Sequence, residues 1–131
     1  MMTDPMADML TRIRNGFKEK KAHVDIPASR IKAQVAKVFL EHGYVKNVKY
    51  LEDDKQGVLR VYLKYDEARR SAIEGLRRVS LASRRVYVTK DHLPRVQGGY
   101  GTAVISTSRG ILTEKECRAL GVGGEVLCHI W

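Results

Sequence analysis

Apolar residues recur at helical spacing near the start of the chain. Asp4 suits an N-cap and Pro5 suits the first helical position. Five apolar residues at i, i+3, i+4, i+7 and i+11 then form one stripe: Met6, Met9, Leu10, Ile13 and Phe17. Arg14, Asn15 and Lys18 fall on the polar flank, which by itself indicates a solvated face. The pattern predicts an amphipathic first helix that ends soon after Phe17.

The next segments alternate between strand and helix patterns. Residues 22–26 predict a short strand, and Ser29 suits the N-cap of a second helix that Gly43 ends. We expect four residues of this helix to face the core: Ile31, Val35, Val38 and Phe39. We expect three basic residues of the helix to face away from the core: Arg30, Lys32 and Lys37.

Residues 44–51 and 58–65 alternate like strands around a polar hairpin loop, residues 52–57. The order helix, strand, helix, strand, strand predicts an α/β domain over residues 1–66, with two helices on one face of a three-stranded sheet. If the helices pack side by side, four basic residues should lie near one end of this domain: Arg14, Lys18, Arg30 and Lys32.

Residues 67–131 predict a second domain that is mostly β, so the fold class is α+β with two small packed domains. Four segments have strand patterns: residues 71–80, 84–89, 102–106 and 125–131. Between the last two, Thr113 and Glu116 have the spacing of a capping box, and Gly121 suits the end of a helix of about two turns. This short helix would brace a hydroxyl-rich loop, residues 106–110, and a glycine-rich one, residues 121–124.

Composition indicates the class of partner. The 131 residues contain 24 Lys and Arg against 15 Asp and Glu, a net charge of +9. This excess predicts a polyanionic partner, most often nucleic acid and less often an acidic membrane surface. Residues 67–131 contain nine Arg and two Lys, and Arg favours bidentate phosphate contacts and stacking on bases.

Several enzyme classes are excluded because the sequence lacks the residue types and spacings that they need. Ser106 and Ser108 lie in no nucleophile-elbow motif, and the chain has no phosphate-binding P-loop motif. The run Gly121-Val-Gly123 lacks the third glycine of a dinucleotide-binding motif. We therefore predict no catalytic residues and no cofactor. Residues 52–54 are the nearest acidic cluster for a nuclease-like metal site, and they lie on a hairpin tip far in sequence from the basic stretch.

The remaining chemistry-bearing residues fit structural roles. Cys117 and Cys128 have no Cys-x-x-Cys spacing, so we expect two reduced thiols in a cytosolic protein. The four histidines have no ligand spacing, and no metal site is expected. No stretch approaches the length of a membrane span, and the first five residues lack the apolar core of a signal peptide.

Three segments resemble a known family, small-subunit ribosomal protein eight of bacteria and organelles. They are residues 4–15 (DPMADMLTRIRN), residues 106–113 (STSRGILT) and residues 121–127 (GVGGEVL). The similarity spans the whole chain. It departs at residues 81–83, where Leu-Ala-Ser replaces the usual Lys-Pro-Gly.

The resemblance implies a non-catalytic, structural constituent of the ribosome, in the cytoplasm or an organelle. It implies an α/β N-terminal part, a mostly β C-terminal part, and binding to the central domain of small-subunit rRNA early in assembly. In some bacteria the same surface represses translation of the family's own operon mRNA. The family also suggests small-subunit proteins five and twelve as neighbours.

If the partner is RNA, short hydroxyl side chains can donate hydrogen bonds to, and accept them from, 2′-hydroxyls in the shallow minor groove. We therefore expect RNA contacts in the second domain from Ser106, Thr107 and Ser108. Arg109 would meet a phosphate, and Gly110, Gly123 and Gly124 would allow close backbone approach. The resemblance also places Glu125 at the RNA surface. Tyr87 is a candidate for base stacking. Four residues of the first domain would supply phosphate contacts: Arg14, Asn15, Arg30 and Lys32.

Simpler interpretations stay open for these residues. Residues 106–108 fit an ordinary strand end, Glu125 fits a satisfied strand-edge carboxylate, and Tyr87 fits a packed sheet residue. An enzyme acting on nucleic acid and a protein–protein adaptor are the competing function classes. The adaptor predicts weak salt dependence, whereas RNA binding through several phosphates weakens steeply with salt.

Overall fold

The computed structural model describes residues 4–131. Met1 to Thr3, which begin the segment in which we find no signal peptide, lie outside the described residues. The described chain forms two compact units, Pro5–Ile73 and Glu74–Trp131 with Asp4. The domain boundary that we place after residue 66 stays a prediction.

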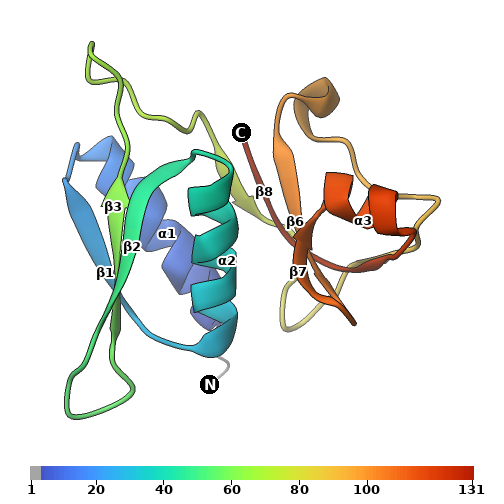
Figure 1. Cartoon of the computed structure of the whole chain (residues 1–131), viewed down its shortest axis with the longest axis horizontal. Helices are drawn as coiled ribbons and strands as arrows, with labels where there is room; N and C mark the ends of the chain where they lie inside the picture. Colours follow the sequence, from blue (N-terminus) through green and yellow to red (C-terminus); the bar gives the residue numbers. More distant parts are fainter. Residues whose placement is uncertain (1–3) are drawn as a thin grey trace. The chain divides into compact units, whose positions relative to one another are not determined.

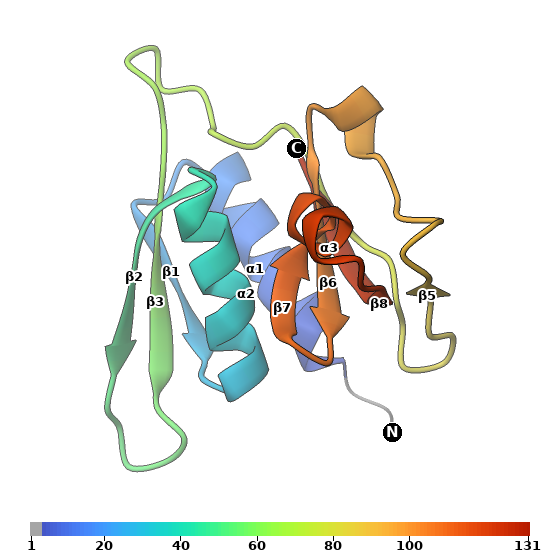
Figure 2. The same cartoon turned by 45° about the vertical axis from the view of Figure 1, so that its right-hand side comes forward.

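The first unit, Pro5–Ile73, is a three-stranded antiparallel sheet with two helices on one face (Figures 1 and 2). Its elements are α1 (Pro5–Lys18), β1 (His23–Pro27), α2 (Arg30–Glu41), β2 (Val45–Leu51) and β3 (Val58–Leu63). The strand order is β1-β3-β2. The predicted α/β architecture and the hairpin loop at residues 52–57 are confirmed.

Local sequence signals define the helices of this unit. All five residues of the predicted α1 stripe are buried. Ser29 caps α2, since its side chain accepts a hydrogen bond from the backbone N–H of Lys32. At the other end Gly43 has φ +78°, and the next residue, Tyr44, donates its N–H to the Phe39 carbonyl. This pattern is the Schellman arrangement that a C′ glycine allows.

Two residues at the start of α2 are reversed relative to the prediction. Ile31 is 41% exposed, whereas Lys32 is only 5% exposed. The Lys32 ammonium donates to the Pro27 carbonyl at 2.8 Å, which gives the buried cation an acceptor. The expectation that Lys32 faces away from the core is therefore wrong.

The basic residues of the two helices do not gather at one end. β1 and β2 are both antiparallel to β3 and hence parallel to each other. Helices α1 and α2 therefore run in the same direction, as Figure 2 shows. Arg14 and Lys18 lie in the second half of α1, whereas Arg30 begins α2. Because the two helices run in the same direction, Arg14 and Lys18 lie at one end of the helical layer and Arg30 lies at the other.

The second unit, Asp4 and Glu74–Trp131, is a five-stranded sheet with one short helix (Figure 1). Its elements are β4 (Leu76–Arg78), β5 (Tyr87–Val88), a 3-10 turn (Val96–Gly99), β6 (Thr102–Thr107), β7 (Gly110–Thr113), α3 (Glu114–Leu120) and β8 (Gly124–Ile130). The order is β4-β8-β6-β7, and β5 also pairs with β8. A cluster of buried side chains packs between α3 and the sheet: Val96, Ala103, Ile105, Cys117 and Val126.

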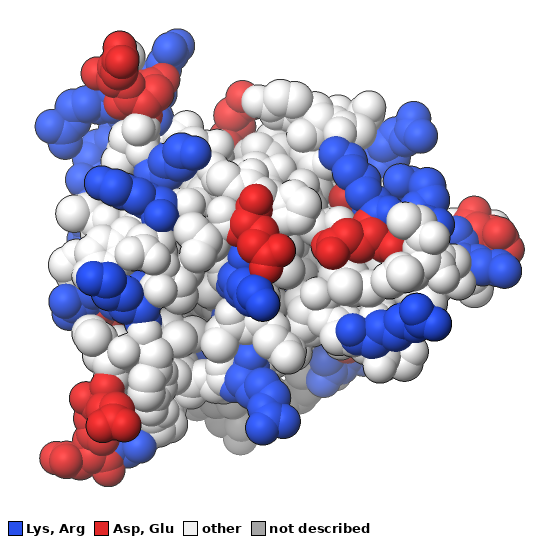
Figure 3. Space-filling view, in the orientation of Figure 1, with Lys and Arg blue, Asp and Glu red and all other residues white. Residues whose placement is uncertain are grey.

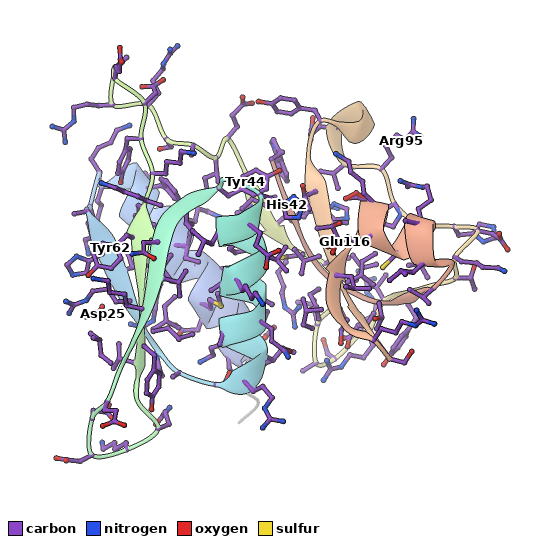
Figure 4. The ribbon with its side chains drawn as sticks, in the orientation of Figure 1. Asp25, His42, Tyr44, Tyr62, Arg95 and Glu116 are labelled. Atoms are coloured by element: carbon purple, nitrogen blue, oxygen red, sulfur yellow. The ribbon has the colours of Figure 1, made fainter. Side chains whose placement is uncertain are left out.

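The capping box that we predicted for α3 is present. Thr113 Oγ1 accepts from the Glu116 N–H at 3.2 Å, and Glu116 (labelled in Figure 4) accepts from the Thr113 N–H at 3.0 Å. Gly121 ends the helix with φ +68°. Cys117 and Cys128 are buried free thiols, as expected. Burial raises the pKa of both, that of Cys128 to about 12.

The strands of this unit differ from the prediction in length and number. The segment 71–80 contributes only Leu76–Arg78 as strand, and the segment 84–89 contributes only Tyr87–Val88. Both pair with the same edge of β8, β4 along its C-terminal half and β5 along its N-terminal half. The chain must therefore turn between them, and Leu81 and Arg84 exchange backbone hydrogen bonds around this turn. A tight turn thus forms at residues 81–84 although its sequence departs from the family's usual one.

The sequence analysis did not predict strand β7 (Gly110–Thr113). Because Thr107 pairs with Gly110 and Val104 with Thr113, residues 104–113 form a β-hairpin with only Ser108 and Arg109 at its tip. The hydroxyl residues are therefore the end of a hairpin and not an irregular loop.

In the part of the chain that the structure describes, no helix is long and apolar enough to cross a membrane.

Candidate nucleic-acid interface

The β6–β7 hairpin tip is held by its own side chains and backbone. Thr107 Oγ1 donates to the Gly110 carbonyl at 2.9 Å and accepts from the Arg109 N–H at 3.0 Å. Gly110 has φ +106°, a backbone conformation that other residues rarely adopt. Thr107 and Gly110 therefore shape the tip, and the Thr107 hydroxyl proton is used inside the protein.

The neighbouring side chains at this tip are available to a partner. Within residues 4–131, the side chains of Ser106, Ser108 and Arg109 make no hydrogen bond or ion pair. Ser108 and Arg109 are exposed, and Ser106 is half-buried. Two hydroxyl groups and one guanidinium are thus held on a rigid turn without internal partners.

Sheet pairing brings three of the candidate residues into one row. Glu125 on β8 pairs with Tyr87 on β5 on one side and with Ser106 on β6 on the other. Directly paired residues point to the same face of a sheet. Tyr87 is 68% exposed, so it is not a packed core residue. An aromatic ring, a carboxylate and a hydroxyl from three strands therefore share one face.

Glu125 in this row is a satisfied carboxylate. It accepts hydrogen bonds from Ser80 Oγ at 2.5 Å and from Arg85 Nη1 at 2.9 Å. Burial raises the pKa of Glu125, but the hydrogen bonds from Ser80 and Arg85 outweigh it, and the net pKa is lowered. Ser80 Oγ also accepts from the Val86 N–H, so Glu125 fixes the backbone just before Tyr87.

Ser80 and Arg85 are residues that sequence reasoning missed. Arg85 lies in the basic stretch, and its alternation with Tyr87 on the same face was the available signal. Nothing local in the sequence indicated that Ser80 would meet a carboxylate 45 residues away.

Gly123 and Gly124 are needed inside the fold. A Cβ at Gly124 would overlap the Ser106 carbonyl, and a Cβ at Gly123 would overlap the Val88 carbonyl. These glycines let β8 enter between β5 and β6, which aligns the row of Tyr87, Glu125 and Ser106. Gly110 differs, because a Cβ there would meet open space.

The four candidates of the first unit have different surroundings. Arg14, Asn15 and Arg30 are exposed. Asn15 lines a groove of about 440 Å³ between α1 and β1, and Arg30 lines another of about 630 Å³ beside Tyr50. Lys32 is buried and bonded to Pro27, which makes it a poor candidate for a phosphate contact.

Both signs of charge occur on each unit. Figure 3 shows acidic residues at the β2–β3 loop and at several other places, with Lys and Arg on both units. Asp53 in that loop accepts from the N–H groups of Lys55 and Gly57. Within residues 4–131 no group of three or more His, Cys, Asp or Glu side chains is placed to hold a metal ion.

Comparison with known proteins identifies the family. The model of the ribosomal protein S8 family matches residues 4–131. The chain belongs to this family. Its relatives include the small ribosomal subunit protein uS8 of Moorella thermoacetica, 55% identical over 130 residues that cover 99% of this chain and all of that protein. The uS8 proteins of Thermodesulfovibrio yellowstonii and Thermotoga maritima are 53% and 52% identical, with full coverage of both chains.

Membership agrees with the resemblance seen in the sequence. The family is structural and not enzymatic, so the chain is a structural constituent of the small ribosomal subunit. The nuclease-like alternative is thereby excluded. Its partners are RNA and proteins of that subunit.

Proposed function

We propose that this chain binds the central domain of small-subunit rRNA directly and helps that RNA fold early in assembly. The specific contacts come from the C-terminal domain, residues 67–131. The observation that carries this proposal is the β6–β7 tip, where Ser106, Ser108 and Arg109 lack internal partners and where the exposed Tyr87 lies in the same row of the sheet as Ser106, across β8.

The chemistry of this surface suits a folded RNA. Ser106 and Ser108 can donate to and accept from 2′-hydroxyls and base edges, which a wide minor groove exposes. Arg109 meets a phosphate, and Tyr87 stacks on an unpaired base. Glu125 acts mainly by holding Ser80 and Arg85 in place, so its role is positioning.

The first unit contributes contacts that carry no sequence information. Arg14, Asn15 and Arg30 reach phosphates and fix orientation, whereas base-edge and 2′-hydroxyl contacts in the second unit give specificity. The chain acts in the cytoplasm, with small-subunit proteins five and twelve as neighbours. The same surface represses its own operon mRNA where that message mimics the rRNA site.

A binding titration tests the assignment. The double variant Ser106→Ala/Ser108→Ala should weaken binding to a central-domain rRNA hairpin about 30-fold, since each lost hydrogen bond is worth about 1 kcal/mol. Arg30→Ala should weaken it only a few-fold, and Asp54→Ala at the other hairpin should cause no loss. Gel shifts at several salt concentrations measure all three.

Two outcomes would contradict the proposal. Equal losses for the double serine variant and Arg30→Ala would mean that the tip does not carry specificity. Binding that hardly changes with salt would favour the protein–protein adaptor, because phosphate contacts release counterions.

A further inference from the structure

The sheet of the first unit has a face that neither α1 nor α2 covers. Alternating residues of β3 point to opposite faces, with Leu59, Val61 and Leu63 buried on the helix side. On the open face two rows cross all three strands. They are His23–Tyr62–Asn47 and Asp25–Arg60–Lys49, each in β1–β3–β2 order.

Tyr62 is the centre of this open face. Its ring centroid lies 5.6 Å from that of His23, and the Lys49 ammonium lies 5.5 Å from the Tyr62 centroid. In the next row Arg60 donates two hydrogen bonds to Asp25, at 2.8 and 3.1 Å. Figure 4 labels Tyr62 and Asp25 on their neighbouring strands. The face is therefore aromatic and cationic, and it is not an apolar surface.

The charge of this face is positive. Arg60 neutralises Asp25, and within residues 4–131 Lys46, Lys49 and Lys64 have no ion-pair partner. Hydrogen bonding to Arg60, which outweighs desolvation, lowers the pKa of Asp25, so this carboxylate stays ionised and paired at neutral pH. Lys49 lies over the Tyr62 ring, and the exposed Lys46 and Lys64 lie at the same end of the sheet as the Tyr62 row, on β2 and just after β3.

We propose that this open face binds an unpaired segment of small-subunit RNA, with a base stacked on Tyr62 and phosphates held by Lys46, Lys49 and Lys64. The inference rests on the small-subunit RNA being the partner of this chain. It adds a second RNA site, on a different unit from the β6–β7 tip.

A single strand fits this face better than a duplex or a protein does. A flat sheet cannot enter the grooves of an A-form helix, whereas splayed bases stack on aromatic side chains. Protein interfaces favour a core depleted of charged residues, which this face does not offer. Lys49 covers the Tyr62 ring in the free protein, but an exposed cation–π contact is weaker than base stacking. A base can therefore displace Lys49, whose ammonium then meets a phosphate.

The groove beside β1 extends this face. It has a volume of about 440 Å³, and His23 and Asp25 belong to both the groove and the open face. Asn15 and Lys21 line its other side. A strand that leaves the sheet across β1 would enter this groove, where the exposed Asn15 amide can contact the RNA backbone.

The test uses the full chain, labelled with ¹⁵N, and octauridylate, which has no secondary structure. Amide shifts should occur on β1, β2 and β3 around Tyr62. Tyr62→Leu should weaken this binding about tenfold through lost stacking. The matched control is Tyr50→Leu, an equally aromatic residue that is 57% exposed and lies outside the two rows. That variant should bind within twofold of the wild type.

Salt dependence gives a second readout that does not depend on a variant. Three lysine–phosphate contacts predict a slope of about −2 for log K against log salt on single-stranded RNA. Octauridylate shifts confined to other surfaces, or equal losses for the two tyrosine variants, would overturn the inference. So would open-face shifts that appear with small-subunit proteins and not with octauridylate.

A failure of this inference can be distinguished from a failure of the proposed function. Ser106→Ala/Ser108→Ala should leave octauridylate binding unchanged while it weakens binding of the rRNA hairpin. Loss of octauridylate binding in the serine variant would place the single-strand site at the β6–β7 tip and would also overturn the inference.

Discussion

The β2–β3 and β6–β7 hairpins have similar construction and opposite chemistry. In the β2–β3 loop Asp53 accepts from the N–H groups of Lys55 and Gly57, and Gly57 has φ +92°. In the β6–β7 tip Thr107 has the corresponding role, and Gly110 has φ +106°.

Their exposed side chains separate the two hairpins. The β2–β3 loop presents acidic residues, at positions 52–54, which a polyanion avoids. The β6–β7 tip presents Ser108 and Arg109. A tight, side-chain-braced turn is therefore common to both and does not define an RNA site. Charge and unused hydrogen-bonding groups distinguish them.

The largest expected effect concerns the two turn glycines. Gly57→Ala should lower the free energy of unfolding by about 2 kcal/mol, because positive φ is strained for alanine and the exposed Tyr50 ring must also move and give up its hydrogen bond to Gln56. Gly110→Ala should cost only about 1.5 kcal/mol, because its Cβ meets open space and only the φ strain remains. Urea unfolding measures both. A larger loss for Gly110→Ala would break the comparison.

Lowering the pH should have a smaller effect on stability, through protonation of Glu125 next to the β6–β7 tip. The pKa of Glu125 is lowered, so its hydrogen bonds to Ser80 and Arg85 stabilise the folded state above its ordinary pKa of about 4.3. That contribution is lost as the pH falls through the lowered pKa. Since Arg85 is half exposed, the loss should be less than about 1 kcal/mol.

The contribution of Glu125 to the free energy of unfolding can be measured by urea unfolding of the wild type and Glu125→Gln, at pH 7 and near pH 3. The variant should be less stable at pH 7, and the difference should shrink at low pH. A difference that grows at low pH would contradict the lowered pKa.

Much of the first unit was predictable because its signals are local. The α1 stripe, the Ser29 cap and Gly43 each depend on residues within a few positions of one another. Lys32 was mispredicted because its acceptor is the Pro27 carbonyl, a partner that helical periodicity does not indicate.

The second unit depends on pairings between distant segments. The lengths of β4 and β5 follow from how they share the edge of β8, and β7 has only Ile111 and Leu112 as apolar residues. The candidate residues at 106–110 were named from the sequence. Their grouping with Tyr87 and Glu125 required the register of three strands.

A tethered hydroxyl-radical probe tests the central claim most directly. The native thiols are buried, and burial raises the pKa of both, so a single exposed cysteine can be labelled selectively. With the probe on Ser108→Cys, the account predicts cleavage at a compact set of nucleotides in the central domain of the small-subunit rRNA. With the probe on Asp54→Cys, those nucleotides should stay intact. Cleavage of the same nucleotides from Asp54→Cys, with none from Ser108→Cys, would contradict the account.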